Sequence, residues 1–143
     1  MDETFTASTS VMIAAPIDVV WDALVNPETI RQYLHGTQTI TDWGVGSPIL
    51  WRGEWQGTSY EDKGVVLAME PPGRLRYTHY SPMSGSEDRP ENYHEITCDL
   101  SERDGQTKLT LAQGNNASQK EADDSVAHFW APALQIIKKV AEN

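Results

Sequence analysis

One long helix is predicted for residues 118–143, SQKEADDSVAHFWAPALQIIKKVAEN. Ser118 and Glu121 form a capping box there, a pair of side chains that satisfies two backbone donors where a helix begins. With about 100° of rotation per residue, the apolar residues of this stretch fall on one broad face. We expect that face to be buried, and the residues that carry this prediction are Val126, Phe129, Ala133 and Ile137. Pro132 is expected to kink the helix, because proline cannot donate the backbone hydrogen bond of an interior position.

A long helix with a broad apolar face requires a broad, curved partner, and the residues before it predict an antiparallel sheet. Alternation with a period of two is typical of strands, and it occurs in residues 5–13, 49–56, 59–70, 75–79, 94–100 and 107–111. Two short helices are predicted after the first strand, one beginning at Pro16 and one over residues 27–35. The expected architecture is therefore α+β, with a curved antiparallel sheet wrapped around a C-terminal helix over residues 119–142.

The composition is that of an acidic protein with an ordinary balance of apolar and charged residues. The length of 143 residues suggests one domain over residues 1–143. The 21 acidic and 11 basic residues give a net charge of −10, which argues against binding to nucleic acid or to an anionic membrane. No signal peptide is recognised, and no apolar run approaches the roughly 20 residues of a membrane span. Cys98 is the single cysteine, so we expect no internal disulfide and a cytoplasmic protein, monomeric or homodimeric.

No set of residues predicts catalysis, a bound metal or a cofactor. His94 and Cys98 lie four residues apart on one predicted strand, so their Cα atoms are roughly 13 Å apart at about 3.3 Å per residue. Zinc–ligand bonds are only about 2 Å long, so these two residues cannot share an ion unless others reach in. Cys98 also lies between two apolar neighbours on one face and is interpreted as a small buried hydrophobe. The motifs of nucleophilic hydrolases, phosphate loops and dinucleotide sites do not occur.

Several short motifs occur in an order that one protein family shares. They are IAAP at 13–16, VWDAL at 20–24, DWGVGS at 42–47, WRGE at 51–54, EPPGRLRY at 70–77 and FW at 129–130. Through these motifs the chain resembles the activator of heat-shock-protein-90 ATPase-like family, within the START-like (SRPBCC) helix-grip superfamily. The resemblance implies a START-like domain with a cavity between the concave face of the sheet and the long helix. In the superfamily such cavities bind lipids, sterols, polyketides or other apolar molecules, and some members are cyclases or aromatases.

Large aromatic side chains and two histidines are predicted to face that cavity. A buried Tyr or Trp needs a partner for its polar atom, and a partly polar cavity provides one. For each residue taken alone, a place in the packed core is an open alternative. If His79 and His94 share the concave face, they are neighbours across two strands. The residues expected to bind a ligand are Tyr33, near the mouth, and Trp51, Trp55, Tyr77, His79, His94 and Trp130.

Three functions are compatible with such a cavity. The first is the binding of an apolar small molecule, lipid-like or aromatic, without chemistry. The second is an enzyme of the cyclase or aromatase type, which would use a histidine or tyrosine of the cavity as acid or base. The third is contact with a chaperone through an apolar patch outside the cavity. The sequence favours the first function.

Overall fold

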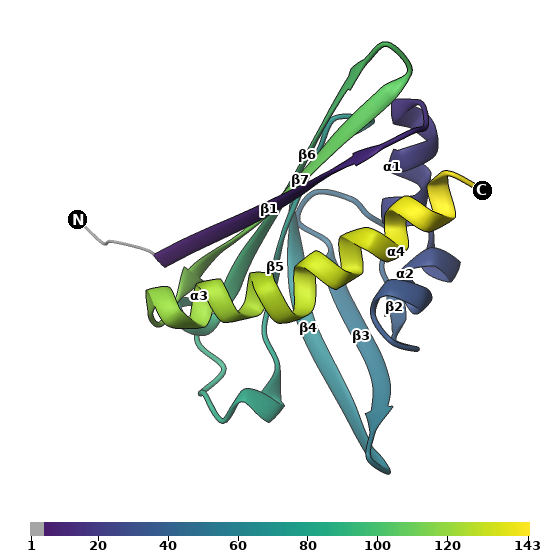
Figure 1. The fold of residues 1–143 in the computed structure, drawn as a ribbon. Coiled ribbons are helices and arrows are strands. Elements are labelled where there is room, and N and C mark those ends of the chain that lie inside the picture. The colour runs from purple at the N-terminus through teal and green to yellow at the C-terminus, as the bar shows by residue number, and fades with distance from the viewer. Residues whose placement is uncertain (1–4) are drawn as a thin grey trace.

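The computed structural model of the chain describes residues 5–143, except for the side chain of Trp55. Within this part, a seven-stranded antiparallel sheet curves around the C-terminal helix (Figure 1). The strands are β1 (Phe5–Ile13), β2 (Gln38–Ile40), β3 (Pro48–Trp55), β4 (Thr58–Glu70), β5 (Arg74–His79), β6 (His94–Arg103) and β7 (Gln106–Asn116). Their order across the sheet is β1-β7-β6-β5-β4-β3-β2. The helix-grip architecture predicted from the sequence is thereby confirmed.

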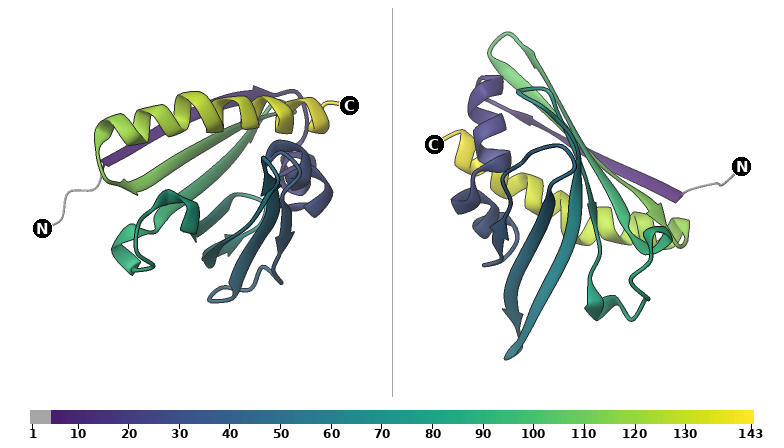
Figure 2. Two further views of the ribbon diagram at one scale, coloured as in Figure 1. Left: turned by 90° about the horizontal axis from the view of Figure 1, so that it is seen from below. Right: turned by 180° about the vertical axis from the view of Figure 1, so that it is seen from behind.

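Helices cover one side of the sheet. They are α1 (Ile17–Val25), α2 (Pro27–Tyr33), α3 (Gln119–Ser125), the π-helical segment η3 (Val126–Trp130) and α4 (Ala131–Ala141). Two short 3-10 turns, η1 (Pro82–Ser84) and η2 (Pro90–Asn92), lie in the loop between β5 and β6. The short helices α1 and α2 lie beside the C-terminal end of α4, and α3 lies at the opposite end of the molecule (Figures 1 and 2). None of the described helices is long and apolar enough to cross a membrane.

Local signals determine where the short helices begin and end. The Asn26 side chain accepts a hydrogen bond from the Glu28 N–H at 2.9 Å and Pro27 occupies the first turn, so α2 begins where predicted. It ends two residues earlier than predicted, because His35 and Gly36 have positive φ angles of 57° and 91°, which a right-handed helix excludes. The sequence does not predict β2, since its three residues are too few to show alternation.

A π turn interrupts the C-terminal helix. The Ala131 N–H donates to the Val126 carbonyl, five residues back instead of the four of an α-helix. Pro132 follows at once as the second residue of α4. The irregularity that the sequence predicts at the proline is therefore a wider turn just before it.

The π turn changes which side chains face the core. Residues four apart share one face of the wider turn, so Val126 and Trp130 are buried, while Phe129 is 37% exposed. The prediction that Phe129 is buried is wrong, because a wheel drawn at 100° per residue does not allow for the extra residue in the turn. The other predicted core positions, Val126, Ala133 and Ile137, are buried.

The sheet bends where β4 passes β5, and Gly64 allows the bend. A Cβ atom at this position would lie 1.7 Å from the Thr78 carbonyl oxygen and 3.3 Å from the Trp51 ring. The regular register between the two strands is broken nearby, and the Val65 N–H donates to the Thr78 hydroxyl at 2.9 Å instead. In Figure 1, β3 and β4 diverge from β5, β6 and β7 below this point. The bend separates a packed end of the molecule from an open one.

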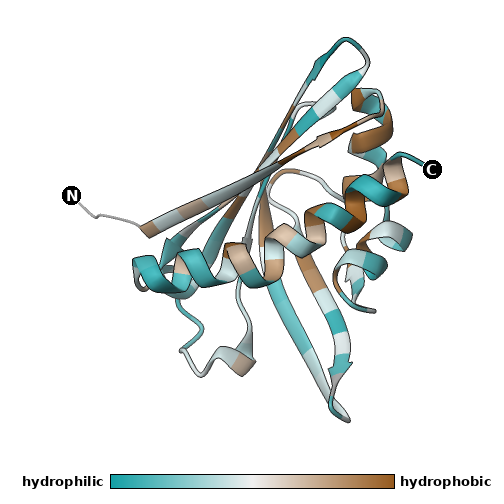
Figure 3. Cartoon of the chain, viewed as in Figure 1, coloured by the Kyte–Doolittle hydropathy of each residue, from teal (hydrophilic) through white to brown (hydrophobic). Residues whose placement is uncertain are grey.

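The packed core lies where the sheet meets α1, α2 and α4. Hydrophobic residues gather on α1 and α4, whereas α3 is mostly hydrophilic (Figure 3). Cys98 is fully buried as predicted, and burial raises the pKa of its thiol to about 12, so the thiol stays protonated near neutral pH. The side chains that fill this end, each at most 2% exposed, are Ile13, Val20, Leu24, Ile30, Leu134 and Ile137.

Candidate functional site

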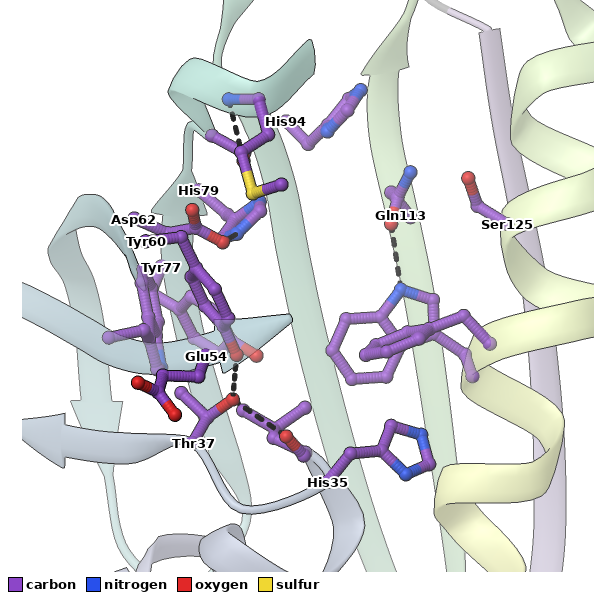
Figure 4. Close-up of a pocket in the computed structure, with 16 residues that line it drawn as sticks. His35, Thr37, Glu54, Tyr60, Asp62, Tyr77, His79, His94, Gln113 and Ser125 are labelled. Atoms are coloured by element: carbon purple, nitrogen blue, oxygen red, sulfur yellow. Dashed lines mark hydrogen bonds and ion pairs between the residues drawn. The ribbon is translucent and has the colours of Figure 1, made fainter. Parts of the chain in front are cut away.

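A pocket of about 790 Å³ lies between the concave face of the sheet and the π-helical part of the C-terminal helix. Its walls come from β3 to β7, from η3, from the connection between α2 and β2, and from the loop that carries η1 (Figure 4). A volume of several hundred Å³ is typical of sites for small molecules. Five of the residues predicted to bind a ligand line this pocket, namely Trp51, Tyr77, His79, His94 and Trp130.

Tyr33 lies in the core and does not line the pocket. Its side chain is 5% exposed, and its hydroxyl donates to the Leu24 carbonyl of α1 at 2.8 Å. Burial raises the pKa of this hydroxyl above its ordinary value, so the group stays neutral. The predicted place near the mouth is therefore wrong, because the face of α2 that carries Tyr33 packs against α1. Trp55 ends β3, and its side chain falls outside what the structure describes.

Aromatic rings form the sheet side of the pocket. Trp51 on β3 meets the Tyr77 ring of β5 with 5.6 Å between centroids, and it meets the His79 ring at 5.1 Å. Tilted and edge contacts of this kind are the ones that aromatic rings prefer. Burial raises the pKa of the Tyr77 hydroxyl well above its ordinary value, so this wall also carries a neutral hydroxyl.

Trp130 forms the helix side, and its indole is held by a chain of buried amides. Its Nε1–H donates to Gln113 Oε1 at 2.7 Å, and Gln113 Nε2 donates to Asn116 Oδ1 at 2.7 Å. Asn116 in turn donates to the Phe5 carbonyl at 2.8 Å. These bonds satisfy the polar atom of the indole within the protein, so the ring presents its apolar surface to the pocket.

Phe129 and His35 flank the mouth of the pocket. The Phe129 ring lies edge-on to Trp130 with 4.8 Å between centroids, and the His35 ring lies edge-on to Phe129 at 6.1 Å. Both side chains are exposed and both line the pocket. The π turn is what places Phe129 here rather than in the core.

Two histidine–carboxylate pairs lie on the floor of the pocket. His79 Nε2 is 2.9 Å from Asp62 Oδ2, and His94 Nε2 is 2.8 Å from Glu121 Oε1. His79 and His94 are direct partners across β5 and β6, which confirms that they share the concave face as neighbours. Of the predicted capping box, the Ser118 half is present, since the Glu121 N–H donates to the Ser118 hydroxyl at 3.0 Å, whereas the Glu121 carboxylate accepts from the Ala117 N–H at 3.3 Å.

A hydroxyl pair ties the β3–β4 hairpin to the start of β2. The Thr37 hydroxyl donates to the Leu34 carbonyl at 2.6 Å, so the Tyr60 hydroxyl, 2.5 Å away, is the donor to Thr37. The Tyr60 ring lies across Gly53, where a Cβ atom would be 2.5 Å from the tyrosine oxygen. The glycine therefore leaves the space in which Tyr60 closes this side of the pocket.

The loop between β5 and β6 forms the remaining wall and is anchored by two tyrosines. The rings of Tyr80 and Tyr93 stack with 5.2 Å between centroids, and the Tyr80 hydroxyl donates to the Ser86 carbonyl at 2.5 Å. The Tyr93 hydroxyl donates to Asp88 at 2.6 Å, and Asp88 also pairs with Lys63 of β4. This wall is therefore fixed to the sheet by its own contacts.

Several polar residues of the pocket are not predicted from the sequence, among them Tyr60, Asp62 and Gln113. A signal for Gln113 exists, because it continues the alternation of the inward-facing residues of β7, Leu109 and Leu111. Asp62 and Tyr60 likewise lie on the face of β4 that carries Val66, two and three alternations before it. Polar residues at the end of an apolar row are easily assigned to solvent, which is why the pattern did not reveal them.

Nothing among residues 5–143 groups three or more His, Cys, Asp or Glu side chains in a way that could hold a metal ion. The two histidines are instead each hydrogen-bonded to a carboxylate. A carboxylate that accepts a hydrogen bond from an imidazole N–H fixes which nitrogen carries the proton.

The comparisons with known proteins agree with this geometry. The sequence profile of the family described as "Activator of Hsp90 ATPase homolog 1-like protein" matches residues 14–142. The solution structure of ChR145 from Cytophaga hutchinsonii is 43% identical, with a TM-score of 0.85 over 100% of this chain and 97% of that one. CalU16 from Micromonospora echinospora is 24% identical, with a TM-score of 0.70 over 95% of this chain and 75% of that one.

The fold is also shared with DynU16, a protein of the dynemicin biosynthetic locus. It is 18% identical, with a TM-score of 0.76 over 97% of this chain and 48% of that one. A comparison with curated proteins finds no match.

Proposed function

The chain belongs to the Activator of Hsp90 ATPase homolog 1-like family, and on that premise we propose that it binds a planar, largely apolar small molecule in the pocket. The observation that carries the proposal is the pair of facing aromatic walls around a volume of about 790 Å³. One wall is Trp51 and Tyr77 on the sheet, and the other is Trp130 and Phe129 on the helix. Flat rings on two sides favour a flat ligand between them.

Each wall is supported by contacts of its own, which keeps the pocket from collapsing. Trp130 is held by Gln113, and Trp51 is wedged between Tyr77 and His79. Ligand sites are mostly apolar with a small number of placed polar groups, and the histidines and Tyr60 supply such groups here.

A titration with 2-methoxynaphthalene tests this function. Binding between the walls should quench tryptophan fluorescence, and the melting temperature should rise with probe concentration because the probe binds only the folded state. Phe129→Ala should weaken binding several-fold, since it removes one ring at the mouth. Val45→Ala is the matched control, because Val45 is 67% exposed and does not line the pocket. Absence of quenching, or equal affinity in all three proteins, would contradict the proposal.

A second function, acid–base catalysis of the cyclase or aromatase type, is favoured by one observation. The two imidazoles on the pocket floor are each paired with a carboxylate, as the base of a proton-transfer site commonly is. Contact with a chaperone stays a prediction, and calorimetric titration with purified Hsp90 tests it.

A further inference from the structure

We propose that His79 and His94 act together as proton acceptors, and that the ligand is a planar molecule with an acidic hydroxyl, a phenol or an enol, directed at them. This inference rests on the proposed binding function and adds the chemical group that the pocket recognises. It is carried by a row of side chains that crosses the pocket floor.

The row runs across four strands and ends on a helix. Trp51 and Asp62 are direct partners across β3 and β4, and His79 and His94 are direct partners across β5 and β6. Asp62 reaches sideways to His79, and Glu121 reaches down from α3 to His94. Each histidine therefore has a carboxylate on its outer side and the other histidine on its inner side. Asp62, His79 and His94 are labelled in Figure 4.

Hydrogen-bond chemistry assigns the protons in this row. An ionised carboxylate can only accept, so Nε2 of each ring carries the proton that Asp62 or Glu121 accepts. In a neutral imidazole the other nitrogen, Nδ1, then holds a lone pair. Within residues 5–143, no side chain or backbone group bonds to either Nδ1. The His79 and His94 side chains are 32% and 28% exposed, and both line the pocket.

The carboxylate behind His79 has no other partner. Asp62 Oδ1 is buried and makes no hydrogen bond among the described residues, so the carboxylate is directed at the imidazole alone. Its side chain is 15% exposed, which limits the competition from water. A buried carboxylate with a single imidazole partner holds that ring in one tautomer and one orientation.

Several of the other polar groups around the pocket already have partners within the protein. Trp130 donates to Gln113, Gln113 donates to Asn116, and the Tyr60 hydroxyl donates to Thr37. His79 and His94 are paired on adjacent strands and both line the pocket, so their Nδ1 atoms are the acceptors that we assign to the ligand hydroxyl. A ligand hydroxyl can donate a hydrogen bond to such an acceptor, whereas an ether or a hydrocarbon leaves it without a partner.

The proton transfer is balanced without a further reactant. The ligand O–H bond breaks, an N–H bond forms at Nδ1, and the electron pair stays on the ligand oxygen as a phenolate or enolate. The imidazolium that forms keeps its Nε2–H on the carboxylate. The neutral Tyr77 hydroxyl, two residues from His79 on the same face of β5, is a donor available to the new oxyanion.

The test uses 2-naphthol, whose hydroxyl becomes strongly acidic in its excited state. We expect the wild-type protein to bind 2-naphthol about tenfold more tightly than 2-methoxynaphthalene, which has the same ring without the donor. Excited outside the tryptophan band, bound 2-naphthol should emit as naphtholate, because Nδ1 takes its proton. In the double variant His79→Gln and His94→Gln, the bound probe should emit as neutral naphthol and lose its advantage in affinity.

A histidine outside the pocket supplies the matched control. His128 lies on η3 and does not line the pocket, so His128→Gln should behave as wild type in both measurements. Glutamine can still donate to Asp62 and Glu121, which favours folding of the double variant. The comparison of the two probes on the wild-type protein needs no variant at all.

Three results would overturn the inference. Equal affinity of the wild type for the two probes means that no acceptor recognises the hydroxyl, while the binding function itself stands. Naphtholate emission that persists in the double variant identifies water or another group as the base. Failure of both probes to bind removes the inference together with the proposed function.

Discussion

The same sheet and the same C-terminal helix enclose a solid core at one end of the molecule and a pocket at the other. At the packed end, aliphatic side chains of α1, α2 and α4 fill the space, and Leu134 and Ile137 are each 1% exposed. At the open end, aromatic rings face one another across about 790 Å³. The packed side chains are branched and can interdigitate, whereas the rings of Trp51 and Trp130 are held in place by their own contacts.

The comparison indicates that side-chain contacts support the walls of the pocket, in addition to the bend of the sheet at Gly64. A buried amide chain fixes the helix wall, and cross-strand ring contacts fix the sheet wall. The π turn then exposes Phe129 at the point where the core gives way to the pocket. Five substitutions test the two ends of the molecule and the bend between them.

The largest effect is expected at the bend between the two ends. Gly64→Ala would place a Cβ atom 1.7 Å from the Thr78 carbonyl oxygen, a backbone atom that cannot move without opening the sheet. We expect a loss of more than about 4 kcal/mol in the free energy of unfolding, or failure to fold. Gly73→Ala is the control, because the nearest atoms to its Cβ would be 3.9 and 4.0 Å away. Urea unfolding of both variants makes the measurement, and similar midpoints would show that the sheet tolerates a wider bend.

At the packed end, Ile137→Ala should cost about 2–5 kcal/mol, because it leaves a cavity among fully buried neighbours. Ile137 is 1% exposed and belongs to the face of α4 that meets the core. Affinity for 2-methoxynaphthalene should change little, since this residue does not line the pocket. Chemical unfolding tests the loss of stability, and the binding titration tests the unchanged affinity. A large loss of affinity without loss of stability would show that Ile137 belongs to the pocket and not to the packed core.

At the helix wall, Gln113→Leu should cost about 1–3 kcal/mol, because it leaves the Trp130 Nε1–H and Asn116 Oδ1 without their partner. Gln106→Leu on the same strand is exposed and serves as the control. The tryptophan emission should also shift, as the indole loses its bond. An unchanged melting temperature would indicate that the amide chain does not support this wall.

At the mouth, Phe129→Ala should cost less than about 1 kcal/mol, whereas a fully buried phenylalanine would cost about 3–5 kcal/mol. The reason is the 37% exposure that the π turn gives to this side chain. Thermal and urea unfolding provide the value. A loss of several kcal/mol in the free energy of unfolding would show that the Phe129 ring belongs to the packed core and would contradict the distinction between the two ends of the molecule.

The smallest effect concerns acid stability at the packed end. The Glu142 carboxylate accepts from the Ala14 N–H at 2.7 Å and from Lys138 Nζ at 2.6 Å, and these bonds hold its pKa below the ordinary 4.5. The ionised Glu142 carboxylate therefore stabilises the folded protein at neutral pH. This stabilisation is lost as the pH falls below 4.5, the ordinary pKa, and through the lower pKa that Glu142 has in the folded state. Unfolding midpoints between pH 6 and pH 3 should fall less steeply for Glu142→Gln than for the wild type. Parallel slopes would show that this contact does not contribute.

Much of this structure could be predicted from the sequence, because it depends on the periodicity of apolar residues and on helix-capping residues. Alternation gave the strands and placed Trp51, Tyr77 and His79 on the concave face, and the capping box gave the start of the long helix. The sequence predicts the pairing of His79 with His94 on the condition that both share the concave face, and the structure has this pairing. These features are local or concern neighbouring strands, so short-range signals suffice to find them.

The remaining features depend on contacts that no local pattern contains. Phe129 was assigned to the core because the helical wheel assumes one constant rotation, and a π turn violates it. The sequence predicts Tyr33 at the mouth because no local pattern shows the angle between α1 and α2, which brings the Tyr33 hydroxyl to the Leu24 carbonyl. Asp62 was missed since a carboxylate on an inward face is recognisable only once the imidazole that it serves is known.

The order of the strands has a consequence for how the chain folds during its synthesis. β1 is made before the other strands of the sheet, but its partner is β7, and the Thr107 hydroxyl donates to the Ala15 carbonyl across 92 positions of the chain. Until β7 leaves the ribosome, β1 has no strand to pair with, and α1 and α2 lack the helix α4 against which they pack. Closing so long a loop carries an entropic cost before any contact repays it, which slows folding of the sheet. β1 is therefore the strand that waits longest for its partner, and the sheet is complete only once β7 has been added.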